Sequence, residues 1–180
     1  MSNKYELTDE TKVFYGVTLH RIRALTAVGV LAAAGQLGGW VESENNLDQS
    51  GNAWVYGNAR VYGNAQVYGN AWVSGDAQVY GDAQVYGNAW VSGDAQVYGN
   101  AQVYGNGLIV WFSHVGSENG TLTVYNTKDN SLEVTRGCFR GTIDAFLSAS
   151  EKKHDDQTHL EYRLLIEVAH SRITRARGAV

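Results

Sequence analysis

The fold of this 180-residue chain is decided by residues 51–106, which read GNAWVYGNARVYGNAQVYGNAWVSGDAQVYGDAQVYGNAWVSGDAQVYGNAQVYGN. Glycine recurs at every sixth position, followed by asparagine or aspartate, alanine, a variable residue, valine, and tyrosine or serine. A period this strict is typical of a solenoid, in which each repeat buries its apolar side only by stacking on its neighbours. Six residues then form one side of a triangular coil, and three such sides complete a turn.

Alanine and valine are the two apolar residues that every repeat shares, from Ala53 and Val55 onward. Because they stand two positions apart, they point to the same side of an extended segment. We therefore predict that they fill the interior of the solenoid. Glycine followed by asparagine or aspartate forms the corners, since glycine accepts unusual dihedral angles and the other two tolerate the left-handed region.

The residues that flank each valine point outward and sort into three faces. One face carries a column of tryptophans beside a column of small hydroxyl residues, and the other two carry glutamine and tyrosine ladders. Stacked identical side chains stabilise parallel coils. The first face includes Trp54, Trp72, Trp90, Ser74 and Ser92, and the second includes Arg60, Tyr62, Tyr80 and Tyr98.

The tryptophan face is predicted to be an interface between subunits. Three exposed indoles in one column make a larger apolar patch than a soluble monomer normally leaves in contact with water. The expected interface residues are Trp54, Trp72, Trp90, Ser74 and Ser92. The alternatives are a surface for another partner or ligand, simple ladder packing, and cover by a terminal segment of the same chain.

Composition restricts the compartment and the class of partner. The net charge of −4 argues against nonspecific binding to duplex nucleic acid. Cys138 is the only cysteine, which excludes an internal disulfide and favours a reducing cytoplasm. The polar segment Met1–Glu10 lacks the apolar core of a signal peptide, and the apolar segment Ala24–Gly39 is too short and interrupted to span a membrane. We expect a cytoplasmic protein.

Residues 1–48 are predicted to form an N-terminal strand cap, because a solenoid exposes unpaired backbone groups at its ends. Val13–Leu25 reads as one or two short strands. Val41 and Leu47 are six residues apart but lie two residues out of register with Val55. This spacing predicts an irregular first coil that contains a small insertion. The regular repeats then occupy residues 49–106.

Residues 107–180 are predicted to form a C-terminal ββαα unit. Ile109 and Val115 still fall on the six-residue grid, so we expect the solenoid to continue for one or two less regular sides. Strands are predicted at Leu108–Val115, Thr121–Tyr125 and Ser131–Thr135. The first helix is expected from Ile143 with Thr142 as its cap. The second is expected near His159, with a capping box of Thr158 and Glu161 and an apolar stripe of Leu160, Leu164, Leu165 and Val168.

Each valine is followed four positions later by a small residue, as in Val55 with Ala59. This pattern resembles the left-handed parallel β-helix of hexapeptide repeats, a mainly β fold that is commonly trimeric. A narrower resemblance, to hexapeptide-repeat proteins encoded by phages and prophages, covers nearly the whole chain. It is carried by Leu19–Leu25 (LHRIRAL), Gly38–Leu47 (GGWVESENNL) and Gly137–Thr142 (GCFRGT). It implies a homotrimer in the cytoplasm of a host cell.

Hexapeptide β-helices often belong to acyltransferases that use acetyl-CoA and a histidine base. None of the five histidines lies in the regular coils, and no loop interrupts them. His114, beside Val115, is the best-placed candidate base. His154, Asp155, Asp156 and His159 have metal-ligating side chains but no fixed ligand spacing, so we predict neither a metal nor a cofactor.

These observations favour a non-enzymatic, trimeric binding protein of phage or prophage origin. Its expected role is counter-defence, through inhibition of a host immune complex or sequestration of a nucleotide signal. The alternatives are an acetyl-CoA-dependent acyltransferase and a structural virion component. Arg21 and Arg23 share one face around Ile22 and could hold a phosphate. The predicted ligand or partner contacts are Arg21, Arg23, Arg60, Tyr62, Tyr80 and Tyr98.

Overall fold

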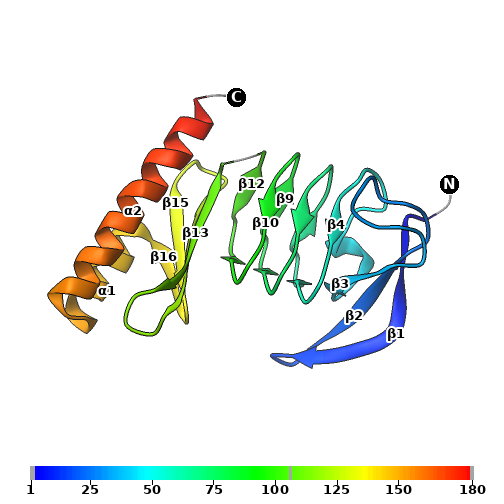
Figure 1. Cartoon of the computed structure of the whole chain (residues 1–180), viewed down its shortest axis with the longest axis horizontal. Coiled ribbons are helices and arrows are strands. Elements are labelled where there is room, and N and C mark those ends of the chain that lie inside the picture. The colour runs from blue at the N-terminus through cyan, green and yellow to red at the C-terminus, as the bar shows by residue number, and fades with distance from the viewer. Residues whose placement is uncertain (1–2, 106, 179–180) are drawn as a thin grey trace.

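A three-sided β-solenoid forms the middle of the chain, between an N-terminal hairpin and a C-terminal sheet with two helices (Figure 1). This computed structural model describes residues 3–105 and 107–178. The predicted boundary at residue 106 therefore lies outside the described residues. The two ends of the molecule are built from antiparallel hairpins, whereas the coils between them pair in parallel.

Each face of the solenoid is a parallel sheet of very short strands, one strand per coil. Residues 18 positions apart pair in register, as in Trp54 with Trp72 and Trp72 with Trp90. The prediction of parallel stacked coils is confirmed. The strands are β4 (Trp54–Val55), β7 (Trp72–Val73) and β10 (Trp90–Val91) on the first face, β5 (Arg60–Val61), β8 (Gln78–Val79) and β11 (Gln96–Val97) on the second, and β6 (Gln66–Val67), β9 (Gln84–Tyr86) and β12 (Gln102–Tyr104) on the third.

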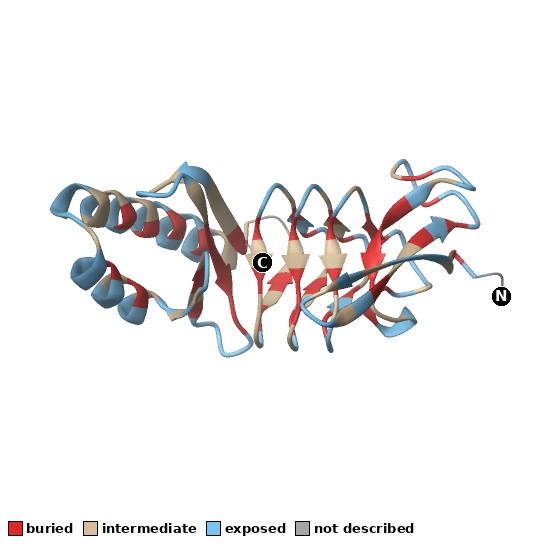
Figure 2. Ribbon diagram, turned by 90° about the horizontal axis from the view of Figure 1, so that it is seen from below, coloured by how far each residue is buried: buried red, intermediate tan, exposed pale blue. Residues whose placement is uncertain are grey.

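The interior of the solenoid consists of the repeated alanines and valines, as predicted. Every one of them from Ala53 to Val103 is at most 1% exposed. Full burial of one valine side chain stabilises a fold by about 1.5–3 kcal/mol, so the repeated pair supplies most of the driving force for coiling. Figure 2 shows this alternation as buried inner positions between exposed corners.

The irregular first coil is also confirmed. Strand β3 (Leu37–Val41) pairs in parallel with β5, so that Val41 lies opposite Val61, and Leu47 lies opposite Val67. Both offsets are 20 residues (61 − 41 and 67 − 47), against 18 between Val55 and Val73 (73 − 55). The short helix η1 (Glu44–Asn46) forms this corner. Buried Asn46 there donates two hydrogen bonds of 2.9 Å to the carbonyls of Gly63 and Ala65.

The first strand of the N-terminal cap begins at Tyr5, earlier than the predicted strands within Val13–Leu25. Strands β1 (Tyr5–Phe14) and β2 (Val17–Ala24) form an antiparallel hairpin that extends the β3–β5–β8–β11 sheet to six strands. Part of the polar N-terminal segment, from Tyr5 to Glu10, therefore belongs to β1. Just before it, Lys4 Nζ donates to the carbonyls of Ser50 (3.2 Å) and Ala53 (2.9 Å), which satisfies backbone groups at the open end of the coils.

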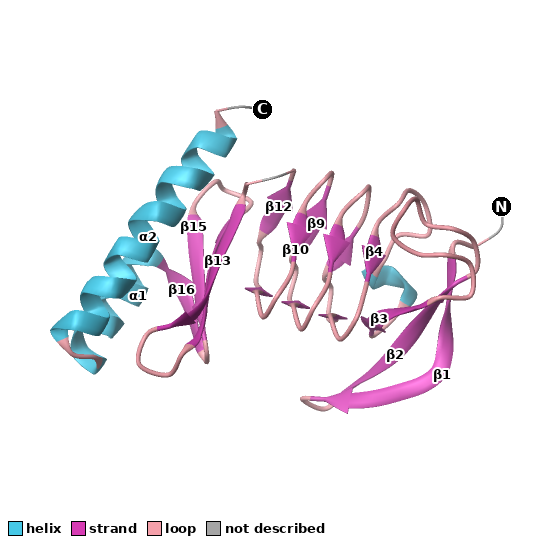
Figure 3. Ribbon diagram, viewed as in Figure 1, coloured by secondary structure: helices cyan, strands magenta, loops and turns pink. Residues whose placement is uncertain are grey.

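The C-terminal unit is a four-stranded antiparallel sheet that lies between the solenoid and two helices (Figure 3). Its elements are β13 (Ile109–Val115), β14 (Gly120–Asn126), β15 (Leu132–Arg136), β16 (Phe139–Thr142), α1 (Ile143–Lys153) and α2 (Asp156–Arg177). The expected continuation of the solenoid through Ile109 and Val115 is wrong, because β13 turns back to pair antiparallel with β14. Thr135 Oγ1 donates to the carbonyl of Gln96 (2.7 Å) and closes this end of the coils.

The first helix begins at Ile143 with Thr142 as its cap, as predicted. The second begins at Asp156, not near His159, because the Asp155 carboxylate accepts the Thr158 amide (2.8 Å) and caps the helix three residues earlier.

The predicted apolar stripe of α2 is also wrong. Leu160, Leu164 and Val168 are 48–54% exposed, and Leu165 is partly buried. The buried side consists of Tyr162, Ile166, Ala169 and Ile173. The spacing of the aliphatic residues alone does not predict this side, because the aromatic ring of Tyr162 packs against Phe146 and sets the rotation of the helix.

Corner glycines are predicted to differ in how much they tolerate a side chain. Gly75 and Gly87 both have a positive φ, of 69° and 63°. A Cβ at Gly75 would lie 2.9 Å from the Gly93 nitrogen, whereas at Gly87 the nearest atom is 3.4 Å away. We expect Gly87→Ala to cost about 1–2 kcal/mol from the left-handed conformation alone. Gly75→Ala should cost about 1–3 kcal/mol more from overpacking. Urea unfolding of both variants tests this, and equal losses would contradict the stacking geometry.

Candidate binding surface

All six residues predicted to bind a ligand belong to, or directly follow, strands of the six-stranded sheet. Arg21 and Arg23 lie on β2 and Arg60 on β5, while Tyr62, Tyr80 and Tyr98 directly follow β5, β8 and β11. Arg21 pairs in register with Trp40, and Trp40 pairs with Arg60 on the next strand. Arg23 is exposed and pairs with Glu6 at 3.2 Å. We call the outer side of this sheet around Lys12, Phe14, Arg21, Trp40, Arg60 and Tyr62 the cation–aromatic surface.

Trp40 forms the floor of this surface and is only 7% exposed. Lys12 Nζ lies 4.0 Å from its ring centroid, and the Arg21 guanidinium lies 5.1 Å from it. Cations at such distances are attracted to the face of an indole. Lys12 and Trp40 were not predicted as site residues. A register shift in β1 between Leu7 and Thr11 precedes the part of the hairpin that carries Lys12, and no local sequence signal gives that geometry.

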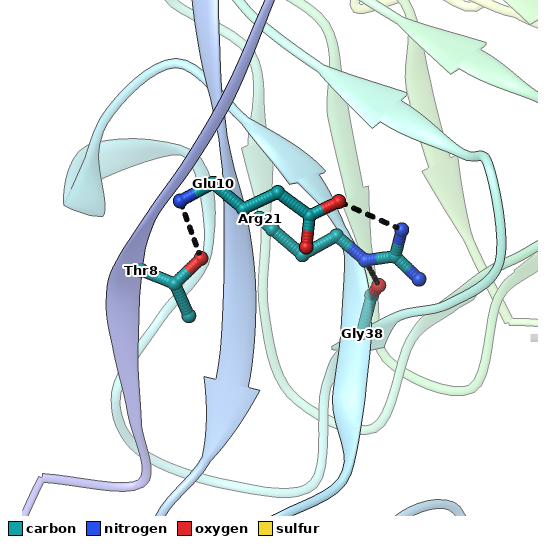
Figure 4. A network of polar contacts seen from close by, with 4 residues as sticks. All are labelled: Thr8, Glu10, Arg21 and Gly38. Atoms are coloured by element: carbon teal, nitrogen blue, oxygen red, sulfur yellow. Dashed lines mark hydrogen bonds and ion pairs between the residues drawn. The ribbon is translucent and has the colours of Figure 1, made fainter.

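Arg21 is held from two sides (Figure 4). Its Nε donates to the Gly38 carbonyl at 2.7 Å, and its Nη1 lies 3.8 Å from a Glu10 carboxylate oxygen. The Glu10 amide in turn donates to Thr8 Oγ1 at 3.3 Å. At 3.8 Å, the Glu10 carboxylate offsets the positive charge of the Arg21 guanidinium only in part. The arginine is therefore fixed in position while most of its charge stays available.

Arg60 is held by weaker contacts, one of them with Phe14 at the end of β1. Its guanidinium lies 4.4 Å from the ring centroid of Phe14, and its Nη2 lies 4.0 Å from an Asp76 oxygen. Its Nε is buried and has no hydrogen-bond partner among the described residues. Such a buried donor requires a physical explanation. Trp40 Nε1 and Tyr80 Oη, on the same sheet, are in the same situation.

A tyrosine ladder continues from this point along the solenoid. Phe14 meets Tyr62 edge to face at 5.9 Å, and Tyr62 stacks on Tyr80 at 5.0 Å with an interplanar angle of 8°. Tyr98 follows at 4.8 Å, and Arg140 of β16 lies over both Tyr80 and Tyr98 at 4.8 and 4.6 Å. Burial raises the pKa of Tyr62 to about 12, so its phenol stays neutral at physiological pH.

The positive groups at this surface repel one another. The pKa of Lys12 is lowered to about 8, first by burial and then by the nearby charges of Arg60 and Arg21, while Asp76 and Glu10 oppose the shift. An anion bound here would relieve that repulsion. Together with the flat rings, this arrangement suits a ligand that carries both a negative group and a ring system.

The other candidate residues are dispersed. His114 is exposed, has a φ of 59°, and lines a hollow of about 230 Å³ with Asp94 and Gln96. Asp155 is engaged as a helix cap, and His154 Nδ1 lies 3.3 Å from Ser117 Oγ. Within residues 3–105 and 107–178, no three His, Cys, Asp or Glu side chains are grouped so as to hold a metal ion.

The tryptophan column is only partly exposed. Trp72 and Trp90 stack at 5.6 Å with an angle of 11°, and Trp90 is 53% exposed beside partly buried Ser74 and Ser92. The expectation that all three indoles are exposed is wrong for Trp54, which is fully buried. Tyr5 packs edge to face on Trp54, and the loop at Gly29 lies against the neighbouring Asn52. The N-terminal segment thus covers this end of the column.

Comparison with known proteins supports the repeat architecture. A family model described as the YdcK beta solenoid repeat matches residues 53–65, 65–81, 77–93 and 83–99. The matches lie within the regular coils, so they identify a β-solenoid repeat in the middle of the chain. A search of curated proteins found no match. Of the helices in the described part of the chain, none has the length and apolar character needed to cross a bilayer.

Stability is predicted to rise with pH between about 8 and 10.5. Lys12 and Lys4 both have a pKa of about 8 in the folded chain, against 10.5 for an ordinary lysine. Below pH 8 both states are protonated, so the cost of holding the charged amines in the fold is fully present. Above pH 8 the folded state loses protons that the unfolded state retains, and the free energy of unfolding increases. In urea unfolding, Lys12→Met should reduce the increase of the unfolding free energy with pH. The part of the increase that comes from Lys4 should remain. An unchanged slope in Lys12→Met would show that Lys12 titrates normally.

Proposed function

We propose that this chain is a non-enzymatic binding protein that holds a nucleotide-class ligand on the cation–aromatic surface. The observation that carries the proposal is the convergence of Lys12, Arg21 and Arg60 around buried aromatic rings. The two arginines have one carboxylate neighbour each, Glu10 at 3.8 Å and Asp76 at 4.0 Å, so with Lys12 three positive groups stand beside two negative ones. The positive charge is thus concentrated at one place on a chain whose net charge is −4.

The chemistry of the groups fits a phosphate joined to a planar base. A guanidinium binds phosphate oxygens through parallel N–H donors, and Arg60 has a single carboxylate neighbour, Asp76 at 4.0 Å. Phe14 and Tyr62 offer ring faces and edges on which a base can stack. The cationic and the aromatic side chains stand on a sheet that is continuous with the solenoid. Binding therefore costs little conformational entropy.

We predict that adenosine monophosphate binds to the intact protein and that adenosine and inorganic phosphate each bind more weakly. Arg60→Met should weaken the nucleotide by about 10- to 100-fold, the size of one lost hydrogen bond to a charged group. Arg23→Gln is the control, since the Arg23 guanidinium is exposed and paired with Glu6 at 3.2 Å, and it should leave the affinity unchanged. Isothermal titration calorimetry measures all three ligands.

The affinity should also fall as pH rises above 8, because the bound anion favours protonated Lys12. Absence of binding by any nucleoside phosphate, or equal losses in Arg60→Met and Arg23→Gln, would overturn the proposal.

We further propose that the protein is a homotrimer that associates through Trp72, Trp90, Ser74 and Ser92. The support is the flat, stacked pair of indoles, of which Trp90 is 53% exposed. Trp54 has no part in this interface because its own N-terminal segment covers it. Large exposed apolar patches on soluble proteins usually mark interaction sites.

Trp90→Ala is predicted to weaken assembly by about 1–3 kcal/mol per subunit contact. Tyr68→Ala removes an aromatic side chain from the third face of the solenoid and should leave assembly unchanged. Sedimentation velocity over a range of protein concentrations compares the two variants with the parent chain. A parent chain that is monomeric at every concentration would exclude the trimer.

The biological setting that we propose is a phage or prophage, and the role is counter-defence. The support is the sequence resemblance carried by Leu19–Leu25, Gly38–Leu47 and Gly137–Thr142, together with a surface suited to a nucleotide. Sequestration of a nucleotide signal requires tight binding without turnover. The same calorimetry samples, analysed afterwards by chromatography, should return the nucleotide unchanged.

A further inference from the structure

A pocket lies in the C-terminal unit, away from the cation–aromatic surface. It has a volume of about 100 Å³ and forms where the β13–β14 turn, the β15–β16 turn and the two helices meet. Cys138, the only cysteine of the chain, is exposed at its edge. We call it the thiol pocket, and its polar lining includes Ser117, Arg136, Cys138, Lys153, His154 and Tyr162.

The walls of the thiol pocket are fixed by aromatic packing. Phe139 meets Phe146 at 5.2 Å, and Phe146 meets Tyr162 at 5.1 Å, both edge to face. The His154 ring packs against Tyr162 at 5.6 Å, and its Nδ1 lies 3.3 Å from Ser117 Oγ. Phe146 and Tyr162 are both nearly fully buried. The pocket is therefore held open by the core of the C-terminal unit and not by a flexible loop.

The charge of this pocket is not balanced. Arg136 donates from Nε to the Tyr162 hydroxyl (3.1 Å) and from Nη2 to the Val115 carbonyl (3.2 Å), and both acceptors are neutral. Among the described residues no carboxylate oxygen lies within 4.0 Å of its guanidinium. Lys153 and His154 add positive or titratable groups from the end of α1, and Glu118 is the acidic residue of the lining.

We propose that the thiol pocket binds a compact oxyanion, a carboxylate or phosphate group, beside Cys138. A guanidinium that is held in place and lacks a carboxylate partner is the usual recognition element for such groups. A water molecule occupies roughly 30 Å³ of liquid, so this cavity admits a group of a few non-hydrogen atoms and not a whole cofactor. The ligand is a small anion or the terminal group of a larger molecule.

Cys138 provides a direct reporter of this site. Its sulfur displaces iodide from iodoacetate or iodoacetamide: a sulfur–carbon bond forms, the carbon–iodine bond breaks, iodide leaves, and the thiol proton passes to solvent. The two reagents differ mainly in the negative charge of iodoacetate. The rate of Cys138 alkylation by iodoacetate is divided by the rate with iodoacetamide, once for the folded chain and once for the chain unfolded in urea. The change in this ratio on folding measures the attraction of an anion to the pocket. Because the chain has one cysteine, mass spectrometry of the intact protein suffices.

We expect the folded chain to favour iodoacetate relative to the unfolded chain. Lys153→Gln should lower this preference by about two- to fivefold, the size of one partly screened charge interaction. Lys152→Gln is the matched control, because Lys152 is exposed on the same turn of α1 and does not line the pocket. Arg136 is left intact in this test, since its hydrogen bonds to Tyr162 and Val115 also support the fold.

Competition identifies the anion. Inorganic phosphate and acetate at millimolar concentration should each slow alkylation of Cys138, and the more protective one shows which group the pocket prefers. The proposal is overturned if neither anion protects the thiol, or if Lys153→Gln and Lys152→Gln give the same rate ratio. Either result is independent of nucleotide binding at the cation–aromatic surface, which lies on the N-terminal sheet.

Discussion

The structure depends on a single constraint, the exact stacking of valine on valine and alanine on alanine every 18 residues. A strand of two residues cannot bury apolar surface or satisfy its backbone alone. It becomes stable only when the coils above and below repeat the same pair in register. The corner glycines follow from this, because the backbone of one coil approaches the next so closely that Gly75 leaves no space for a Cβ. Identical outward columns, such as Trp72 and Trp90, are a consequence of the same register.

A stack of this kind leaves two open ends, and the chain closes them by different means. At the first coil, Lys4 and Asn46 donate side-chain hydrogen bonds to free carbonyls. At the last coil, an antiparallel sheet takes over, with Thr135 bonded to the Gln96 carbonyl and Tyr125 buried against the core. Both ends use polar side chains that are buried or half-buried, since the cost of an unpaired backbone group exceeds the cost of desolvating the side chain. The caps also carry the two candidate binding sites.

How much the sequence predicts depends on whether a feature is periodic. The coils, the buried alanines and valines, the irregular first coil and the start of α1 follow from local spacing. The failures concern contacts between distant segments. Trp54 stands in the same column as Trp90, yet Tyr5 covers it from 49 residues away. The stripe of Leu160, Leu164 and Val168 has the right spacing for a buried face, but Tyr162 and Ala169 determine which side of α2 packs. The sequence does not predict that Lys12 and Trp40 belong to the same surface as Arg60. The β1–β2 hairpin creates that surface, because it places Lys12 over Trp40 and Phe14 against Arg60.

The hairpin therefore decides what the solenoid can recognise. In the regular coils, Gln78 and Gln96 occupy the column in which Arg60 stands, and a ladder of amides and phenols is neutral. The hairpin and β3 add Lys12, Arg21 and Trp40 at one end of this column, and β16 adds Arg140 at the other. Apart from Arg60, the positive charge on this sheet is thus introduced by segments outside the repeat, while the repeat supplies their rigid support. This division explains why an internally regular solenoid displays positive charge at particular points, although the chain as a whole is acidic.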